Sequence, residues 1–308
     1  MPLITTFGTD TNFLYWVGLL LGSGSGPQEA IFGGGWNGST YYSTTSIYTY
    51  ANNTTTAGTN LTYSTESVAA TGNSTIGVFG GSGWTSTTTC IYTYSNNTTA
   101  AGTNLTYSAI FLTATGNSTI GVFGGGLNVS TTSIYTYSNN TTAAGTNLTY
   151  SEASLAATGN STIGVFGGGG FLSSTTTTCI YTYSNNTTAA GTNLTYSVSL
   201  LAAAGNSTIG VFGSGWTSTN ANLSTTSIYT YSNNTTAAGT NLTYRASALA
   251  AAGNSAIGVF GGGNNGSNNL STTSIYTYSN NTTKAGTNLT YSAYMLGAAS
   301  SYNPGVNC

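Results

Sequence analysis

The residues of this chain that could perform chemistry are few and widely separated. The 308 residues include two Lys or Arg, four Asp or Glu and no His. His is the usual general base at neutral pH, and glycoside hydrolysis needs two carboxylates about 5–10 Å apart. Glu66 and Glu152 are the only carboxylates expected on one face, and they belong to repeats that lie two apart. We therefore expect a protein that is not an enzyme, with no catalytic residue, no metal site and no cofactor.

Aromatic residues in variable segments are the stronger functional signal. Exposed aromatic rings on loops are costly unless they contact a partner. Flat rings beside Asn, Ser and Thr suit sugar recognition, because ring faces stack on C–H surfaces and amides bind hydroxyls. Trp and Tyr are equally common anchors of protein interfaces. The candidate ligand-binding residues are Trp16, Trp36, Tyr41, Tyr42, Trp84, Phe111, Phe171 and Trp216, with the charged residues Glu66, Glu152 and Arg245.

A sixfold internal repeat positions these residues. One copy begins IYTYSNNTTAAGTNLTYS at Ile91 and continues to Gly126. The block recurs every 43–48 residues, a period that is typical of propellers and solenoids. The first Tyr of the block lies at Tyr48, Tyr92, Tyr135, Tyr181, Tyr229 and Tyr276.

Each copy predicts four short strands separated by Gly, Asn and Ser clusters. In chain order they are a small-residue run as at 155–158, Ile-Gly-Val-Phe as at 76–79, Ile-Tyr-Thr-Tyr as at 134–137, and Asn-Leu-Thr-Tyr as at 193–196. No apolar period of 3.6 residues is long enough for a helix. Small residues suit the crowded axis of a propeller and large residues suit its wide rim, so the pattern favours blades.

The two ends of the chain predict how the ring closes. Residues 292–308 align with the segment after Tyr63, and the sequence around 11–15 matches 103–107. Residues 1–16 and 292–308 should therefore form one shared blade, which leaves no free sheet edge. Six continuous blades and one shared blade predict a single all-β domain over 1–308, a seven-bladed β-propeller of four-stranded antiparallel blades.

The repeat resembles the kelch family of β-propellers over nearly the whole chain. The resemblance rests on the Tyr of the third strand, the bulky residue of the fourth, and the double glycines Gly80-Gly81, Gly124-Gly125, Gly167-Gly168 and Gly261-Gly262. The sequence departs from the family where Tyr replaces the usual Trp, and where Ser214 replaces a glycine. Copper oxidases similar to kelch proteins need His ligands, so the resemblance does not imply that activity here.

Differences among the six copies point to one binding face. The loop after the double glycine and the connection after Asn-Leu-Thr-Tyr vary strongly, whereas the other two turns are nearly uniform. Strands alternate in direction within a blade, so both variable segments should share one face of the disc. Repeat proteins often place variation on the binding face, although an unconstrained surface would also vary. The remaining charges, Asp10, Glu29 and Lys284, should lie in loops of the opposite face.

The composition bounds partners and location. Charged residues make up 2% of the chain, against roughly 25% in ordinary soluble proteins. Two explanations remain open: drift during repeat duplication, or a surface built for a virion or extracellular exterior. Two basic residues exclude a nucleic-acid track. No apolar run is long enough for membrane insertion, and residues 13–21 lack the basic start of a signal peptide.

The cysteines and sequons carry little functional signal. Cys90 and Cys179 occupy the same strand position in repeats that lie two apart, too distant for a disulfide, and Cys308 ends the chain. We expect free thiols. The many N-x-S/T sequons are turn and strand residues of the repeat, so we do not expect wholesale glycosylation.

Three hypotheses follow for function. The first is a recognition propeller on a virion, such as a phage tail fibre or baseplate, or on a cell exterior, that binds a host surface glycan through its aromatic loops. The second is a structural decoration module whose aromatic face docks on another virion protein. The third is an intracellular kelch-like adaptor, which the scarcity of charge disfavours.

Overall fold

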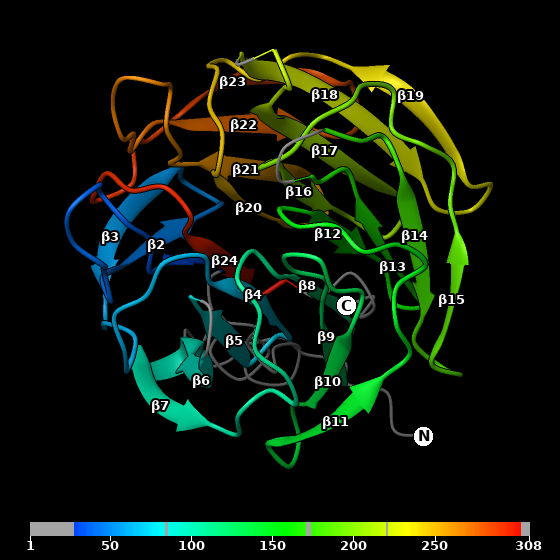
Figure 1. Cartoon of the computed structure of the whole chain (residues 1–308). Helices are drawn as coiled ribbons and strands as arrows, with labels where there is room; N and C mark the ends of the chain where they lie inside the picture. Colours follow the sequence, from blue (N-terminus) through cyan, green and yellow to red (C-terminus); the bar gives the residue numbers. More distant parts are fainter. Residues whose placement is uncertain (1–27, 84–85, 171–173, 220, 303–308) are drawn as a thin grey trace, which may run out of the picture.

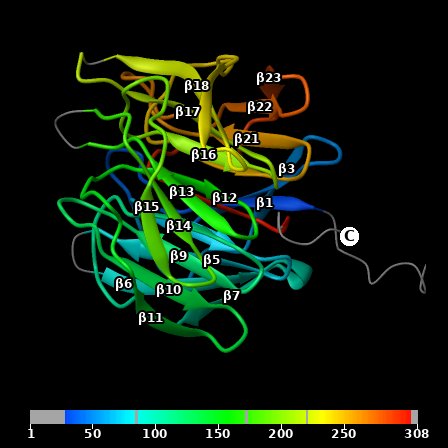
Figure 2. The ribbon, with the colours of Figure 1, turned by 90° about the vertical axis from the view of Figure 1, so that its right-hand side faces the viewer.

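The computed structural model describes residues 28–83, 86–170, 174–219 and 221–302. Within them, six four-stranded antiparallel sheets stand around a central axis as the blades of a β-propeller (Figure 1). Figure 2 shows the same ring turned by 90°. No helix in the described part of the chain is long and apolar enough to cross a membrane.

The blades are numbered along the chain, and each is given from its innermost to its outermost strand. Blade 1 holds β24 (Gly297–Ser300), β1 (Glu29–Gly33), β2 (Thr45–Thr49) and β3 (Thr54–Gly58), and blade 2 holds β4 (Ala69–Gly72), β5 (Ile76–Ser82), β6 (Ser86–Thr93) and β7 (Thr98–Gly102). Blade 3 holds β8 (Thr113–Gly116), β9 (Ile120–Gly124), β10 (Thr132–Thr136) and β11 (Thr141–Gly145), and blade 4 holds β12 (Ala156–Gly159), β13 (Ile163–Gly167), β14 (Thr178–Thr182) and β15 (Thr187–Ala190). Blade 5 holds β16 (Ala202–Gly205), β17 (Ile209–Trp216), β18 (Asn222–Thr230) and β19 (Thr235–Gly239), and blade 6 holds β20 (Ala250–Gly253), β21 (Ile257–Gly261), β22 (Thr273–Thr277) and β23 (Thr282–Gly286). A single 3-10 turn, η1 (Tyr94–Asn96), links β6 to β7.

The ring closes at six blades, so the prediction of seven blades is wrong. The C-terminal strand β24 pairs antiparallel with β1, from Gly33 opposite Gly297 to Ala30 opposite Ser300. In Figure 1, β24 (red) lies at the inside of the ring beside the N-terminal blade in blue. The C-terminal segment 297–300 therefore supplies the inner strand of blade 1. Residues 1–16, which were expected to complete a seventh blade, lie outside the described residues.

The outer strand of each blade also differs from the prediction. Thr-Thr-Ala-Ala-Gly, expected as a turn, forms the fourth strand, as β7 does beside β6. Asn-Leu-Thr-Tyr lies instead in the connection to the next blade, where its Leu is buried, as at Leu105. The outer strand has one pairing partner and exposed side chains, so its sequence carries no strong β signal. Lys284 consequently lies in the outer strand β23, and Glu29 opens β1; neither is in a loop.

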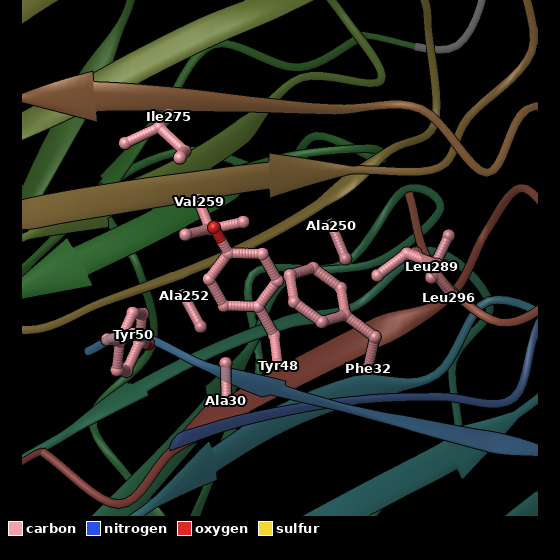
Figure 3. Packing of buried hydrophobic residues seen from close by; sticks show 10 residues of the cluster. All are labelled: Ala30, Phe32, Tyr48, Tyr50, Ala250, Ala252, Val259, Ile275, Leu289 and Leu296. Carbon is pink, nitrogen blue, oxygen red and sulfur yellow. The ribbon is translucent and has the colours of Figure 1, made fainter. Parts of the chain in front are cut away.

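Large aromatic residues pack the space between neighbouring blades. The most completely buried large side chains are the first Tyr of the third strand and the Phe of the second strand in all six blades. Figure 3 shows the interface of blades 6 and 1, where Phe32 and Tyr48 pack with Val259, Leu289 and smaller residues. The predicted free thiols Cys90 and Cys179 are confirmed as free and lie buried in two of these interfaces.

Uncharged hydrogen bonds join the blades near the rim. Asn97, which ends the third-to-fourth strand turn in a left-handed conformation (φ 53°), accepts hydrogen bonds from the Tyr92 hydroxyl and from the backbone N–H of Thr59 in the preceding blade. The same pair of contacts recurs at all six interfaces, on Asn53, Asn97, Asn140, Asn186, Asn234 and Asn281. Hydrogen bonds between neutral amides, hydroxyls and backbone groups thus connect neighbouring blades, so these contacts do not need charged side chains.

The double glycine marks a backbone requirement. Its second residue has a left-handed φ, as at Gly81 (φ 78°), where an added Cβ would lie 2.6 Å from Leu112 Cδ2. In blade 5 the same position is Ser214, which adopts φ 66°. Its hydroxyl donates to the carbonyls of Leu223 and Ala246, at 2.9 and 2.6 Å. These two hydrogen bonds tie Ser214 to β18 and to the connection that leads into blade 6.

Candidate functional site

Two sets of loops lie together on one side of the ring, here called the loop face. They are the second-to-third loops within blades and the interblade connections that lead into each inner strand. Backbone bridges join them, as between Trp216 and Ser199 or between Asn264 and Ser247. The structure therefore places the two variable segments of the repeat against one another.

A pocket of about 410 Å³ opens in the loop face. Its apolar lining comes from Trp216, at the end of β17, and from Phe111, Leu200 and Met295, which lie in three different interblade connections. Its polar wall comes from Asn222, Asn264, Ser199 and Ser247, and two glycines, Gly170 and Gly266, complete the lining with Ser154. None of the described residues that line the pocket carries a charge. A volume in this range is typical of small-ligand sites, which combine apolar walls with a few polar groups.

A ring of six equivalent residues surrounds the axis, and four of its members form the floor of the pocket. Each lies just before an inner strand and has a left-handed φ between 54° and 62°. The members are Ser67, Phe111, Ser154, Leu200, Ala248 and Met295. From Phe111 to Met295, consecutive members bond through their backbones, as the Leu200 N–H does to the Ser154 carbonyl at 3.2 Å and the Met295 N–H does to the Ala248 carbonyl at 2.7 Å. The Ser67 hydroxyl donates to Met295 Sδ at 3.4 Å. We call this set the axial ring.

A smaller cavity of about 120 Å³ lies along the axis and is lined by the axial ring and the six inner strands. Apart from the ring, its lining is mainly Ala and Leu. Phe111, Leu200, Met295 and Ser154 line both this cavity and the loop-face pocket. The axial ring is therefore the boundary between the two spaces.

Side-chain amides connect the pocket to blade 1. The Asn222 Nδ2 donates to the Asn264 carbonyl at 3.2 Å, and the Asn264 Nδ2 donates to Asn269 Oδ1 at 2.7 Å. Asn269 in turn donates to the Asn37 carbonyl, and Asn37 donates to the Tyr42 hydroxyl, at 2.6 and 2.7 Å. Because Asn222 Nδ2 is committed to a carbonyl, the orientation of the Asn222 amide is fixed. Its Oδ1 is buried and has no hydrogen-bond partner among the described residues.

A separate aromatic cluster lies in blade 1. The Trp36 ring lies 6.1 Å from the Tyr41 ring and 5.5 Å from the Tyr294 ring, centroid to centroid. Tyr41 is 52% exposed. Burial raises the pKa of Tyr294, and the nearby Glu66 charge raises it further. Burial also raises the pKa of the Glu66 carboxyl.

The structure divides the predicted site residues into groups. Trp216 and Phe111 meet in the loop-face pocket. Trp36, Tyr41 and Glu66 belong to the blade 1 cluster, and Tyr42 packs edge-on against Tyr291 at 5.5 Å.

The remaining predicted residues are not brought to the pocket. Glu152 is half-buried in the connection into blade 4, and Arg245 is exposed in the connection into blade 6; neither lines the pocket. Trp16, Trp84 and Phe171 lie outside the described residues. No group of three or more His, Cys, Asp or Glu in the described part of the chain could hold a metal ion.

Sequence reasoning missed several pocket residues. Leu200, Met295, Asn222 and Asn264 were not singled out, although all four lie in the variable segments. Aligning the copies at Phe111 would have shown large apolar residues at this position in every second repeat.

Comparison with solved structures agrees with this architecture. The fold is similar to that in "Structure of YjhT", with a TM-score of 0.66 and 9% sequence identity, over 85% of this chain and 98% of that chain. At this identity the likeness shows the kelch-like β-propeller fold alone. No family model matches the sequence, and neither does any curated protein.

Proposed function

We propose that this protein is a non-enzymatic recognition propeller that binds a neutral glycan in the loop-face pocket. One observation carries the proposal: the pocket combines the Trp216 indole with amide and hydroxyl groups, and no charged side chain from the described part of the chain lines it. Indole faces stack on the C–H surfaces of sugars, and Asn and Ser exchange hydrogen bonds with sugar hydroxyls. An anionic ligand would find no cation in this lining.

The available side chains favour binding over catalysis. The sequence has no His, and the carboxylates of the described residues, Glu29, Glu66 and Glu152, do not line the pocket. A general acid or base must reach the reacting group to within about 2.6–3.2 Å or through one water. The pocket offers no group of that kind, so we propose recognition without chemical conversion.

We further propose that the protein works on an exterior, such as that of a virion or a cell, as a phage tail fibre or baseplate component would. Neutral contacts between Asn, Thr and Tyr join the blades, so the ring does not rely on screened ion pairs for its closure. This arrangement suits a protein that meets variable salt while it binds a host surface glycan.

The test is binding of the purified chain to a panel of neutral polysaccharides and to cells that display them. Trp216→Ala is expected to abolish binding and to leave the melting temperature within a few degrees, because Trp216 is half-buried at the pocket wall. Tyr41→Ala is the matched control, since Tyr41 lies on the same face and outside the pocket. Binding that survives Trp216→Ala would refute the assignment of the site.

The blade 1 cluster supports a second candidate function. Among the residues that the structure describes, Tyr41 is the exposed large hydrophobic side chain, and it lies against Trp36, as an anchor of a protein interface would. In this alternative the protein is a structural module that docks on another virion protein. It predicts the reverse result: no glycan is bound, and Tyr41→Ala prevents incorporation of the protein into the particle.

A further inference from the structure

Large and small side chains alternate around the axial ring. Phe111, Leu200 and Met295 come from blades 3, 5 and 1, and they are separated by the small residues Ser67, Ser154 and Ala248. The sixfold backbone thus carries a threefold pattern of large apolar side chains. Three large side chains from alternate blades can converge on the axis, whereas six would crowd it.

The position of these three side chains makes them the floor of the loop-face pocket. Each lines both the pocket and the axial cavity, and each is half-buried. The backbone hydrogen bonds that link Phe111 to Ser154, Leu200, Ala248 and Met295 fix their spacing. The floor is therefore a preformed apolar surface in a pocket whose wall combines the Trp216 indole with polar side chains.

The polar wall adds a directional requirement. Asn222 has its Nδ2 bonded to the Asn264 carbonyl, and its buried Oδ1 lacks a partner among the described residues. A buried unpaired acceptor is costly, and a ligand that donates a hydrogen bond relieves that cost. Ser199 and Ser247 offer hydroxyls in the same pocket.

From this combination we infer that the ligand is a neutral sugar that presents a methyl group to the floor, as a 6-deoxyhexose does. Its methyl group would rest on Phe111, Leu200 and Met295, one pyranose face would stack on Trp216, and its hydroxyls would meet Asn222 and the two serines. A C6 hydroxyl would instead be placed against three apolar side chains and lose its hydrogen bonds to water. This inference rests on the proposed function, because it names the class of glycan that the same pocket binds.

Two pairs of sugars test the inference, since each pair differs only at C6. They are L-rhamnose with L-mannose and L-fucose with L-galactose. In the pair that fits the pocket better, burial of one methyl-sized group predicts that the 6-deoxy sugar binds at least about fourfold more tightly than the sugar with a C6 hydroxyl. Affinities would be measured by titration of Trp fluorescence. Saturation-transfer NMR should show the strongest transfer to the C6 methyl protons.

The axial ring supplies matched variants. Leu200→Ser with Met295→Ser places at two ring positions the residue already present at Ser67 and Ser154, which share the left-handed φ. This double variant should fold and should lose the preference for the 6-deoxy sugar. Ala248→Ser, at a ring position that does not line the loop-face pocket, should retain it.

The outcomes separate the two proposals. Glycan binding that depends on Trp216, with equal or tighter binding of the C6-hydroxylated sugars, would overturn the 6-deoxy inference and leave the proposed function standing. A preference that persists in the Leu200→Ser, Met295→Ser variant would also overturn it. Failure of the wild-type chain to bind any sugar or polysaccharide would overturn both.

Discussion

Two buried tyrosine hydroxyls, those of Tyr94 and Tyr278, have no hydrogen-bond partner among the described residues. In three other blades the equivalent hydroxyl pairs with a Thr on the inner strand of the preceding blade. These pairs are Tyr137 with Thr71 at 3.0 Å, Tyr183 with Thr115 at 3.1 Å and Tyr231 with Thr158 at 3.1 Å. The inner-strand residue in the corresponding position is Ala299 before Tyr94 and Ala204 before Tyr278. The Tyr94 and Tyr278 hydroxyls are therefore unpaired because Ala stands where other blades have Thr.

Ala299→Thr is expected to stabilise the protein by about 1 kcal/mol, because a buried unpaired hydroxyl costs about 1–3 kcal/mol and ordering the new side chain offsets part of the gain. The site has room for the larger residue. Thr71 packs over Gly121 of the next blade, and Ala299 faces Gly77 in the same way. For a domain of this size the gain corresponds to about 2–4 °C in melting temperature. Ala204→Thr, opposite Gly258, should behave alike.

A pair of Tyr→Phe variants provides the control. Tyr94→Phe removes a hydroxyl that has no partner and should be neutral or slightly stabilising. Tyr137→Phe removes a hydroxyl that is bonded to the buried Thr71, so it should cost about 1 kcal/mol or more. Urea unfolding would report both free energies, with an unchanged slope as evidence of an unchanged native state. If Tyr94→Phe destabilises the protein as much as Tyr137→Phe, the Tyr94 hydroxyl has a partner and the reasoning is refuted.

Three further predictions concern the rim, the acid response and the closure of the ring. Asn140→Gly should lower the free energy of unfolding by about 2 kcal/mol, because it removes the hydrogen bonds from Tyr135 and Thr103. Asn140→Ala should lower it by about 1 kcal/mol more, because Ala is strained at the left-handed φ of this position. Equal denaturation midpoints for the two variants would contradict this expectation. Burial raises the pKa of Glu29, so the native state is favoured below the ordinary pKa of 4.5 and loses stability as the pH rises through the folded-state pKa. Glu29→Gln should therefore raise the melting temperature at neutral pH and flatten its pH profile above 4.5, and an unchanged profile would contradict the assignment. A chain that ends before β24 loses the inner strand of blade 1 and should show no cooperative unfolding transition by calorimetry.

The repeat and its four-strand character could be predicted from the sequence, because the second and third strands are β-branched, aromatic and buried. The outer strand could not. Asn-Leu-Thr-Tyr has the more strand-like sequence, yet in the structure its Leu105 is buried between blades. Thr-Thr-Ala-Ala-Gly forms β7 instead and pairs with β6. An edge strand with exposed side chains needs pairing from one neighbour only, so local sequence preference says little about it.

The number of blades depends on a competition that local sequence does not resolve. The small residues at 297–300 indicate an inner strand, but they do not tell whether that strand opens a new blade or pairs with β1. The alignment of the C-terminal segment with other inner strands was correct, since Gly297–Ser300 forms β24. The error was to give that strand a new blade, when it completes the blade that β1, β2 and β3 begin.

The candidate site was predictable in kind and incomplete in detail. Aromatic residues in variable loops led to Trp216 and Phe111, which the structure brings into one pocket. Leu200 and Met295 escaped attention because an isolated aliphatic residue in a loop is unremarkable in sequence. Leu200 and Met295 become pocket residues only because the ring closes, which brings residues nearly a hundred positions apart in sequence together at one axis.

Differences among the copies therefore have two physical origins. Some of them compensate for one another within an interface. In β1, Ala30 stands where the other blades have glycine, and it packs with Ala252, which stands where three other blades have Thr. The Tyr50 hydroxyl, which would otherwise pair with that Thr, bonds to Ser300 at 3.0 Å. Such changes keep the ring closed and need no ligand to explain them. The alternation of Phe111, Leu200 and Met295 with small residues is a different case, because the backbone hydrogen bonds that link the ring from Phe111 to Met295 form whatever the side chains are, and the one printed side-chain contact is from the Ser67 hydroxyl to Met295 Sδ at 3.4 Å. A departure from sixfold symmetry that backbone contacts do not require, placed at the floor of a neutral pocket, is what selection by a bound ligand would leave.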